Sequence, residues 1–201
     1  MPRRYKRKRP LYKRSPPKRR KLSLTDYSKR RKMLASGLPR IVVRKSSRYV
    51  MVQVISPKAS GDVAHACATS KELNSYNWEG GLKNTPVAYL TGLLAGLRAK
   101  AKGIERAIPD IGLSLPVPSS RVFAALKGAA DAGLEVSGDP RVYPPEERIK
   151  GQHIQEYLKA KRERLQESDQ AAPLSLSRVV DIPSRFEEVR NRIISEVGKA
   201  G

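Results

Sequence analysis

The chain has 201 residues, 39% of them hydrophobic, and its 41 Lys and Arg outnumber 19 Asp and Glu to give a net charge of +22. This length suits a single compact domain with one core. So strong a positive charge argues against a typical metabolic enzyme and favours a polyanionic partner. Cys67 is the only cysteine, which excludes an internal disulfide and a cysteine-rich zinc module. We find no apolar run long enough for a membrane span or signal peptide, and expect a cytoplasmic protein without membrane contact.

Most of the charge lies at the N-terminus. Residues 1–32 contain 16 Lys or Arg and one acid, Asp26. A segment with few aliphatic residues and four prolines cannot bury enough surface to offset the entropy that it loses on ordering. Residues 1–37 are therefore expected to form an extended basic arm that is disordered in the free protein.

Residues 38–165 are predicted to form the globular part, which begins with three strands. β-branched residues dominate two short segments, and a turn containing Pro and Gly leads to a third segment with alternating side chains. The predicted strands form an antiparallel meander and span Ile41–Ser46, Tyr49–Ile55 and Asp62–Ser70. A loop over residues 71–84 follows and contains the only tryptophan, Trp78.

A helix is predicted after this loop. Thr85 can cap it, Pro86 suits its first turn, and leucines follow at three- and four-residue steps. Gly103 is expected to end the helix. Gly92 and Gly96 within it are expected to allow close packing against another element.

A fourth strand and a second helix complete the globular part. The predicted strand Ile104–Leu113 contains Pro109, which an interior position of a sheet would not tolerate. The helix is expected to start at Ser119 or Ser120 and to end at Gly133. The predicted order of elements is therefore βββαβα.

Residues 166–201 are expected to form a linker and one amphipathic helix. A Pro-rich loop over 139–148 and a charged helix ending near Arg164 come before them. Ser184 and Glu187 have the spacing of a capping box. The apolar stripe of the last helix must pack on the protein's own core or on a neighbour, and consists of Phe186, Val189, Ile193 and Val197. The fold class is α+β, a three-stranded antiparallel meander followed by αβα, with an extended basic N-terminal arm and C-terminal helices.

The arm combines Lys and Arg clusters with tyrosines. Arginine grips phosphates through a planar fork and tyrosine stacks on bases, so the combination favours RNA over a nuclear-import signal or a solvated tail. Positive charge continues onto the first hairpin, and Trp78 is either a stacking platform or a plug over the sheet edge. The candidate RNA-binding residues are Arg3, Arg4, Tyr5, Lys6, Arg7, Lys8, Arg9, Tyr12, Lys13, Arg14, Lys18, Arg19, Arg20, Lys21, Tyr27, Lys29, Arg30, Arg31, Lys32, Arg40, Arg44, Lys45, Arg48 and Trp78.

A ribonuclease-H type of fold begins with the same order of elements. Its catalysis needs acidic side chains on adjacent strands to hold two metal ions. Residues 27–61 contain no Asp or Glu, so the first two strands supply no ligand. Asp62 and Asp110 could still meet, but Asp62 is more typical of a turn cap, and Asp110, beside Gly112, of a backbone hydrogen-bond acceptor. A metal-dependent nuclease and a chromatin-like protein that compacts DNA are kept as alternatives, and no catalytic residue is predicted.

No metal or cofactor site is predicted either. His65 and Cys67 share one strand face, but two ligands do not make a zinc site, and both are expected in the core. The sequence contains no phosphate-binding Gly-Lys-Ser/Thr loop.

Six blocks of sequence form a collinear pattern over about residues 20–160. They are Thr25-Asp26-Tyr27; Pro39-Arg40-Ile41-Val42-Val43-Arg44; Asn84-Thr85-Pro86 with Ala88-Tyr89-Leu90 and Gly92-Leu93-Leu94; Asp110-Ile111-Gly112-Leu113; Val122-Phe123-Ala124 with Leu126-Lys127-Gly128-Ala129 and Asp131-Ala132-Gly133-Leu134; and Arg148-Ile149 with Gly151 and His153. The pattern resembles the archaeal form of the L-eighteen family of large-subunit ribosomal proteins.

The resemblance implies a noncatalytic protein that binds 5S rRNA and joins it to the large-subunit rRNA at the central protuberance, beside neighbouring ribosomal proteins. It implies no cofactor and no small-molecule substrate. Members of the family approach RNA through the basic N-terminal arm and the surface that continues from it. The implied RNA-binding residues are thus the Arg and Lys clusters of the arm, Tyr27 and the charges of the first hairpin.

Overall fold

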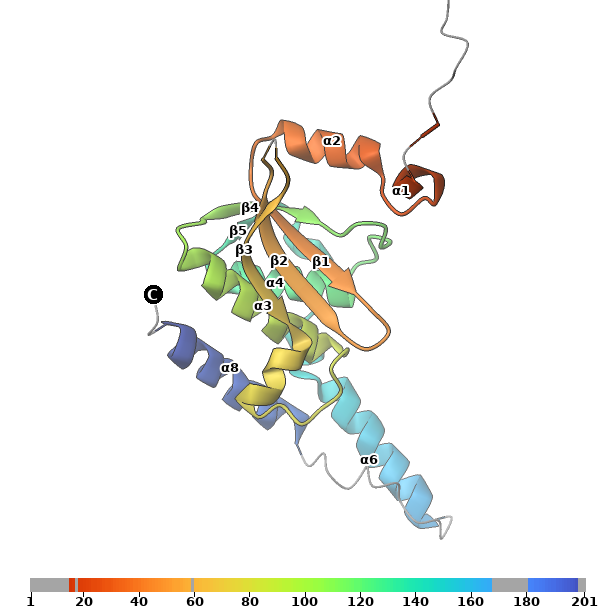
Figure 1. Cartoon of the computed structure of the whole chain (residues 1–201). Coiled ribbons are helices and arrows are strands. Elements are labelled where there is room, and N and C mark those ends of the chain that lie inside the picture. The colour runs from red at the N-terminus through yellow and green to blue at the C-terminus, as the bar shows by residue number, and fades with distance from the viewer. Residues whose placement is uncertain (1–14, 17, 59, 168–180, 199–201) are drawn as a thin grey trace, which may run out of the picture.

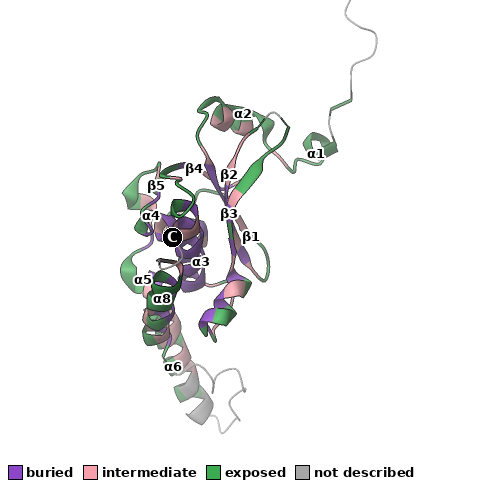
Figure 2. Cartoon of the chain, turned by 60° about the vertical axis from the view of Figure 1, so that its left-hand side comes forward, coloured by how far each residue is buried: buried purple, intermediate pink, exposed green. Residues whose placement is uncertain are grey.

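The computed structural model describes residues 15–16, 18–58, 60–167 and 181–198. Five strands form one mixed sheet in the order β3-β2-β1-β4-β5 (Figure 1). Helices α3 (Thr85–Lys100) and α4 (Arg121–Asp131) pack against one face of this sheet (Figure 2). The expected α+β class is confirmed. The strands are β1 (Arg40–Lys45), β2 (Val50–Ser56), β3 (Val63–Thr69), β4 (Arg106–Asp110) and β5 (Glu135–Val136).

The first three strands form the antiparallel meander that the sequence predicts. β1 pairs with β2, and β2 pairs with β3, both in antiparallel orientation. Val50, Val52 and Val54 of β2 are buried, whereas Met51 and Gln53 between them are only partly buried. This alternation turns one face of the meander toward the helices.

β4 lies beside β1 and runs parallel to it, and the short strand β5 extends the sheet beyond β4. The expectation that Pro109 cannot occupy an interior strand is wrong. The N–H of Ile108 donates to the carbonyl of Pro39, so the backbone nitrogen of Pro109 faces the other side of β4. On that side the pairing with β5 already ends at Ala107, and the proline therefore removes no hydrogen bond of the ladder.

The face of β3 that packs against the core is not the face that the sequence predicts. Ala66 and Ala68 are buried, whereas Cys67 is exposed and His65 only partly buried. The prediction that His65 and Cys67 belong to the core is therefore wrong. Helix α3 packs against this strand, and small alanine side chains permit the close approach.

The cap of α3 differs by one residue from the prediction. Asn84, and not Thr85, is the N-cap, because its side-chain oxygen accepts a hydrogen bond of 3.1 Å from the N–H of Val87. α4 begins after Ser120, as predicted, although the hydroxyl of Ser120 makes no capping hydrogen bond.

Glycines bring the backbones of α3 and α4 into contact. A Cβ atom at Gly92 would lie 1.9 Å from the carbonyl oxygen of Ala125, and one at Gly128 would lie 2.1 Å from that of Tyr89. A Cβ atom at Gly96 would lie 2.7 Å from the Cβ of Ala132, the residue that directly follows α4. Close packing at Gly92 and Gly96 is thus confirmed.

Replacing Gly92 with alanine is expected to lower the free energy of unfolding by about 1 to 3 kcal/mol, because the two helices must separate to admit the methyl group. Denaturant unfolding measures the loss. Gly81→Ala is the matched control, since a Cβ at Gly81 meets no atom within 4 Å. A Gly92→Ala variant as stable as the control would contradict the close contact between the backbones.

Several short helices occupy segments that were predicted as loops. η1 (Ser70–Tyr76) lies in the loop before α3, while η2 (Pro140–Val142) and α5 (Glu146–Lys150) lie in the Pro-rich segment. Helix α6 (Gln152–Glu167) follows α5 after Gly151, whose φ of +84° suits glycine. No helix within the described ranges is long and apolar enough to cross a membrane.

The last helix, α8 (Ile182–Gly198), docks on the protein's own core. Phe186, Val189 and Ile193 are buried, and the ring of Phe186 lies 5.5 Å from that of Tyr89 on α3. The predicted apolar stripe is confirmed, but the predicted capping box is wrong. The helix begins before Ser184, whose hydroxyl donates to the Asp181 carboxylate at 2.5 Å.

The arm contains helices where an extended chain was expected. α1 spans Lys18–Lys21 and α2 spans Tyr27–Ala35, and neither buries a residue. α2 is capped by Asp26, which accepts hydrogen bonds of 3.0 Å from the N–H groups of Ser28 and Lys29. The cap and its charge stabilise the helix start without any apolar stripe, so hydrophobic periodicity could not reveal it.

Candidate nucleic-acid interface

The predicted RNA-binding residues fall into three groups. Ten of them lie in residues 1–14, outside the described part of the chain: Arg3, Arg4, Tyr5, Lys6, Arg7, Lys8, Arg9, Tyr12, Lys13 and Arg14. A second group is exposed on α1, α2 and the hairpin between β1 and β2. The third group is engaged by ion pairs or by packing in the core and consists of Arg30, Arg40, Arg44 and Trp78.

The exposed group carries positive charge that the fold does not neutralise. Within the described part of the chain, none of its nine cationic side chains forms an ion pair with a carboxylate: Lys18, Arg19, Arg20, Lys21, Lys29, Arg31, Lys32, Lys45 and Arg48. Tyr27 at the start of α2 is 38% exposed. Such side chains remain available for phosphates and bases.

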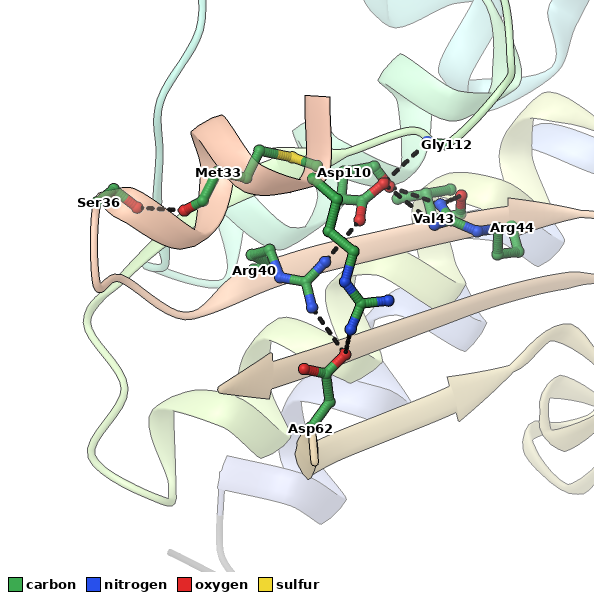
Figure 3. A network of polar contacts seen from close by, with 9 residues as sticks. Met33, Ser36, Arg40, Val43, Arg44, Asp62, Asp110 and Gly112 are labelled. Carbon is green, nitrogen blue, oxygen red and sulfur yellow. Dashed lines mark hydrogen bonds and ion pairs between the residues drawn. The ribbon is translucent and has the colours of Figure 1, made fainter. Parts of the chain in front are cut away.

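Arg40 belongs to the third group, and its burial leaves little surface for the RNA contact that the sequence predicts. Its side chain at the start of β1 is only 3% exposed. Its two terminal nitrogens are occupied, because Nη1 lies 3.0 Å from Asp110 Oδ2 and Nη2 lies 2.8 Å from Asp62 Oδ2 (Figure 3). Arg40 is therefore the centre of an internal ion-pair network.

Two further arginines complete this network. Arg44 Nη2 lies 3.0 Å from Asp110 Oδ1, and Arg44 Nη1 donates to the Asp110 carbonyl at 2.8 Å. Arg30 of α2 approaches Asp62 to 2.8 Å. The side chains of Arg30 and Arg44 are 40% and 42% exposed, so both retain solvent-facing surface beside their carboxylates.

Asp110 stays ionised in this setting. Burial raises the pKa of its carboxyl, but the charge of Arg44, the N–H of Gly112 and the charge of Arg40 outweigh burial and leave the pKa below its usual value. The expected hydrogen bond from Gly112 to Asp110 is confirmed at 2.9 Å. Asp62, predicted as a turn cap, instead pairs with guanidinium groups.

The two carboxylates that could have served a nuclease do meet, but around an arginine. The guanidinium of Arg40 lies between Asp62 and Asp110, where a metal-dependent nuclease would hold cations. Among the residues that the structure describes, no group of three or more His, Cys, Asp or Glu side chains is placed to hold a metal ion. The acids serve to position arginines.

The Arg30–Asp62 contact connects the arm with the sheet. Arg30 is the one member of the network that comes from α2, and Asp62 directly precedes β3. Because Asp62 also contacts Arg40, the helix is linked to the buried network (Figure 3). α2 and its exposed cations are thereby held at the end of the sheet where β1 begins, and the turn between β1 and β2 lies at the other end of β1 (Figure 1).

Trp78 packs as a plug and does not form a stacking platform. It is only 4% exposed and belongs to the hydrophobic core. A Cβ atom at Gly80 would lie 2.9 Å from its ring, so the glycine lets the chain fold closely over the indole. Of the two alternatives that the sequence left open for Trp78, its burial favours the plug.

Comparison with known proteins assigns the family. Residues 12–103 match the model of a family described as ribosomal large subunit proteins 60S L5 and 50S L18. A large ribosomal subunit protein uL18 from Staphylothermus marinus is 46% identical over 192 residues, which cover 93% of this chain and 95% of that protein. The chain belongs to the uL18 family.

Two other archaeal uL18 proteins are similar over nearly the whole chain. The protein from Desulfurococcus amylolyticus is 48% identical over 188 residues, and that from Haloarcula marismortui is 43% identical over 185 residues. Each match covers 92% of this chain and 95% of the relative. The expected resemblance to archaeal large-subunit ribosomal proteins is confirmed, and uL18 proteins are structural constituents rather than enzymes. The nuclease alternative is therefore rejected.

Sequence reasoning missed the structural role of Asp62 and Asp110. The available signal was their scarcity: no acid occurs between Tyr27 and Gly61, although this stretch is rich in Lys and Arg. The first acid after such a stretch has many cations to pair with. The pattern could not show that the partners would be Arg30 and Arg40.

Proposed function

We propose that the chain is a structural constituent of the large ribosomal subunit that binds 5S rRNA and attaches it to the large-subunit rRNA at the central protuberance. Membership in the uL18 family supports the ribosomal role. The observation that carries the RNA contact is the set of exposed, unpaired cations on α1, α2 and the β1–β2 hairpin. No enzymatic step, cofactor or small-molecule substrate belongs to this function.

The proposed interface is divided between the arm and the folded domain. Residues 1–14 contribute eight Lys or Arg and two tyrosines, which can neutralise phosphates and stack on bases. α2 presents further cations at a fixed position, because Arg30 holds it to Asp62. Phosphate contacts of this kind set affinity and orientation, whereas shape and base contacts discriminate between RNAs.

The last helix packs on the chain's own core. α8 already packs on α3, so neighbouring ribosomal proteins need not supply the core of this protein. They would contact the outer surface of the folded domain.

The test is capture of RNA from total rRNA by the full-length chain, followed by sizing of what is bound. A discrete RNA of 5S size is expected, and binding to 5S rRNA should exceed binding to tRNA or duplex DNA at equal salt. Equal affinity for all three would contradict the proposal and favour a protein that compacts nucleic acid without selectivity.

A matched pair of variants places the interface. Arg31→Ala with Lys32→Ala removes two exposed cations of α2 and should reduce the slope of log K against log salt by about two. Lys159→Ala with Arg164→Ala removes two cations of α6, which lies at the other end of the molecule from α2 (Figure 1), and should leave 5S rRNA binding unchanged. A larger loss in the α6 variant would place the interface there.

A further inference from the structure

A groove lies between the arm and the sheet. It has a volume of about 730 Å³ and is lined by α2, by β1 and by the segment after β4. On β1 the lining residues are Arg40, Val42 and Arg44, which alternate with the core residues Ile41 and Val43. The groove therefore opens on the sheet face opposite to α3 and α4. Its volume lies within the range of pockets that hold small organic ligands.

Apolar side chains at the rim of this groove are exposed. Leu113 is 61%, Leu115 78% and Val117 55% exposed, and they alternate along the segment after β4. Leu24, which precedes α2, also lines the groove and is 55% exposed. Exposed apolar side chains gathered at one groove mark a binding site, and nothing in the described residues covers these four.

The charge of the groove favours an anion. Its three carboxylates are already engaged: Asp26 caps α2, and Asp62 and Asp110 pair with arginines. Lys29 and Lys45 also line the groove and pair with no carboxylate in the described ranges. A ligand that fits must therefore combine negative charge with an apolar surface.

We propose that this groove binds an unpaired nucleotide of rRNA, with its base against Leu113 and Leu115 and its phosphate near Lys29 and Lys45. The inference rests on the proposed rRNA binding and assigns a particular subsite within it. A nucleotide combines a base, whose flat faces can pack on apolar side chains, with a phosphate, and these match the two surfaces of the groove. Paired nucleotides cannot enter, because their bases are stacked inside the helix. The arm would thus supply affinity and the groove would recognise single-stranded RNA.

The test compares the full-length chain with the variant Leu113→Ser/Leu115→Ser on 5S rRNA, on a short single-stranded RNA and on a blunt RNA duplex. Binding of both RNAs that contain unpaired nucleotides should weaken about tenfold. Binding of the duplex should not change, and the salt slope should stay the same because no charge is removed. Chemical probing should show an unpaired nucleotide of 5S rRNA that the original chain protects and the variant leaves reactive.

Two controls keep the outcome clear. Ile194→Ser removes an exposed apolar side chain from α8, away from the groove, and should change none of these affinities. Leu115→Ser alone, at the most exposed of the four positions, repeats the comparison if the double variant melts at a lower temperature.

Unchanged binding of single-stranded RNA, or an equal loss on the duplex, would overturn the inference. Normal RNA binding combined with poor incorporation of the variant into large subunits would assign the groove to a protein neighbour and overturn it as well. Lack of preference of the original chain for 5S rRNA over tRNA is a separate result. It would contradict the proposed function, while the comparison of single-stranded and duplex RNA would still test the groove.

Discussion

Replacing Arg40 with alanine is expected to lower the free energy of unfolding by about 3 to 5 kcal/mol. The side chain of Arg40 is 3% exposed and that of Asp110 is 7% exposed, so the substitution takes from a buried carboxylate its buried arginine and leaves it Arg44, which is 42% exposed. Asp62, 26% exposed, keeps Arg30 and contact with water and contributes less to the loss. Denaturant unfolding of the full chain measures the effect.

Arg106→Ala is the matched control, since it also removes one arginine from the start of a strand, although it breaks one exposed ion pair where Arg40→Ala breaks two. The pair between Arg106 and Glu135 is 67% and 64% exposed, so its loss should cost less than about 1 kcal/mol. Adding Asp110→Asn to Arg40→Ala should recover part of the stability, because the buried charge, which then has only the half-exposed Arg44 as its ion-pair partner, is gone. Equal losses for Arg40→Ala and Arg106→Ala would show that the network contributes no more than a surface ion pair.

The regular elements with an apolar pattern could be predicted from the sequence. Strands β1 and β2 and helices α3, α4 and α8 show apolar residues at the spacing of their structure, and all five were expected. β5 was missed because two residues carry no period. α2 was missed because its nine residues include four Lys or Arg and none is buried, so only Asp26 as a cap could have indicated it.

The choice of which face of β3 is buried shows a second limit of predictions from hydrophobic periodicity. The pattern Val63-Ala64-His65-Ala66-Cys67-Ala68 allows either face to be buried, and the larger side chains appeared to be the better core. The structure buries Ala66 and Ala68 because α3 lies close to β3. The small space between β3 and α3 decided which face of the strand is buried, and no local sequence pattern reports that space.

The sequence predicts that the candidate site is rich in Lys and Arg, but it does not predict the role of each residue. Arg40 and Arg44 occupy alternate positions of one strand and look equivalent in the sequence. Their difference comes from carboxylates that are distant in the chain, since Asp62 and Asp110 lie 22 and 70 residues from Arg40. Trp78 was equally undecided until its burial in the core was known.

The network also limits how the arm can be removed without harm to the fold. A cut after Lys32 would delete Arg30 and the first six residues of α2, and so would release Asp62 from its contact with the arm. A chain that begins at Thr25 keeps Asp26 as the cap and keeps the whole of α2. It loses α1, which buries no residue.

Removal of residues 1–24 should strongly weaken rRNA binding and leave the fold intact. The deletion takes away 12 of the 16 Lys and Arg of the arm. If about half of them neutralise phosphates, the slope of log K against log salt should become shallower by about 4 to 5, because fewer counterions are released. Affinity at moderate salt should fall by about two orders of magnitude or more. Binding titrations with 5S rRNA between low and moderate salt measure both quantities.

Calorimetry and a second variant separate charge from folding in this experiment. The melting temperature of the shortened chain should stay close to that of the full chain, since residues 15–16 and 18–24 are exposed. A full-length chain with the same 12 Lys and Arg replaced by glutamine should show the same shallower slope, because counterion release depends on the charges and not on the length of the arm. An unchanged slope in either variant would mean that the folded domain alone carries the phosphate contacts. A large loss of melting temperature in the shortened chain would mean instead that the first 24 residues belong to the folded structure.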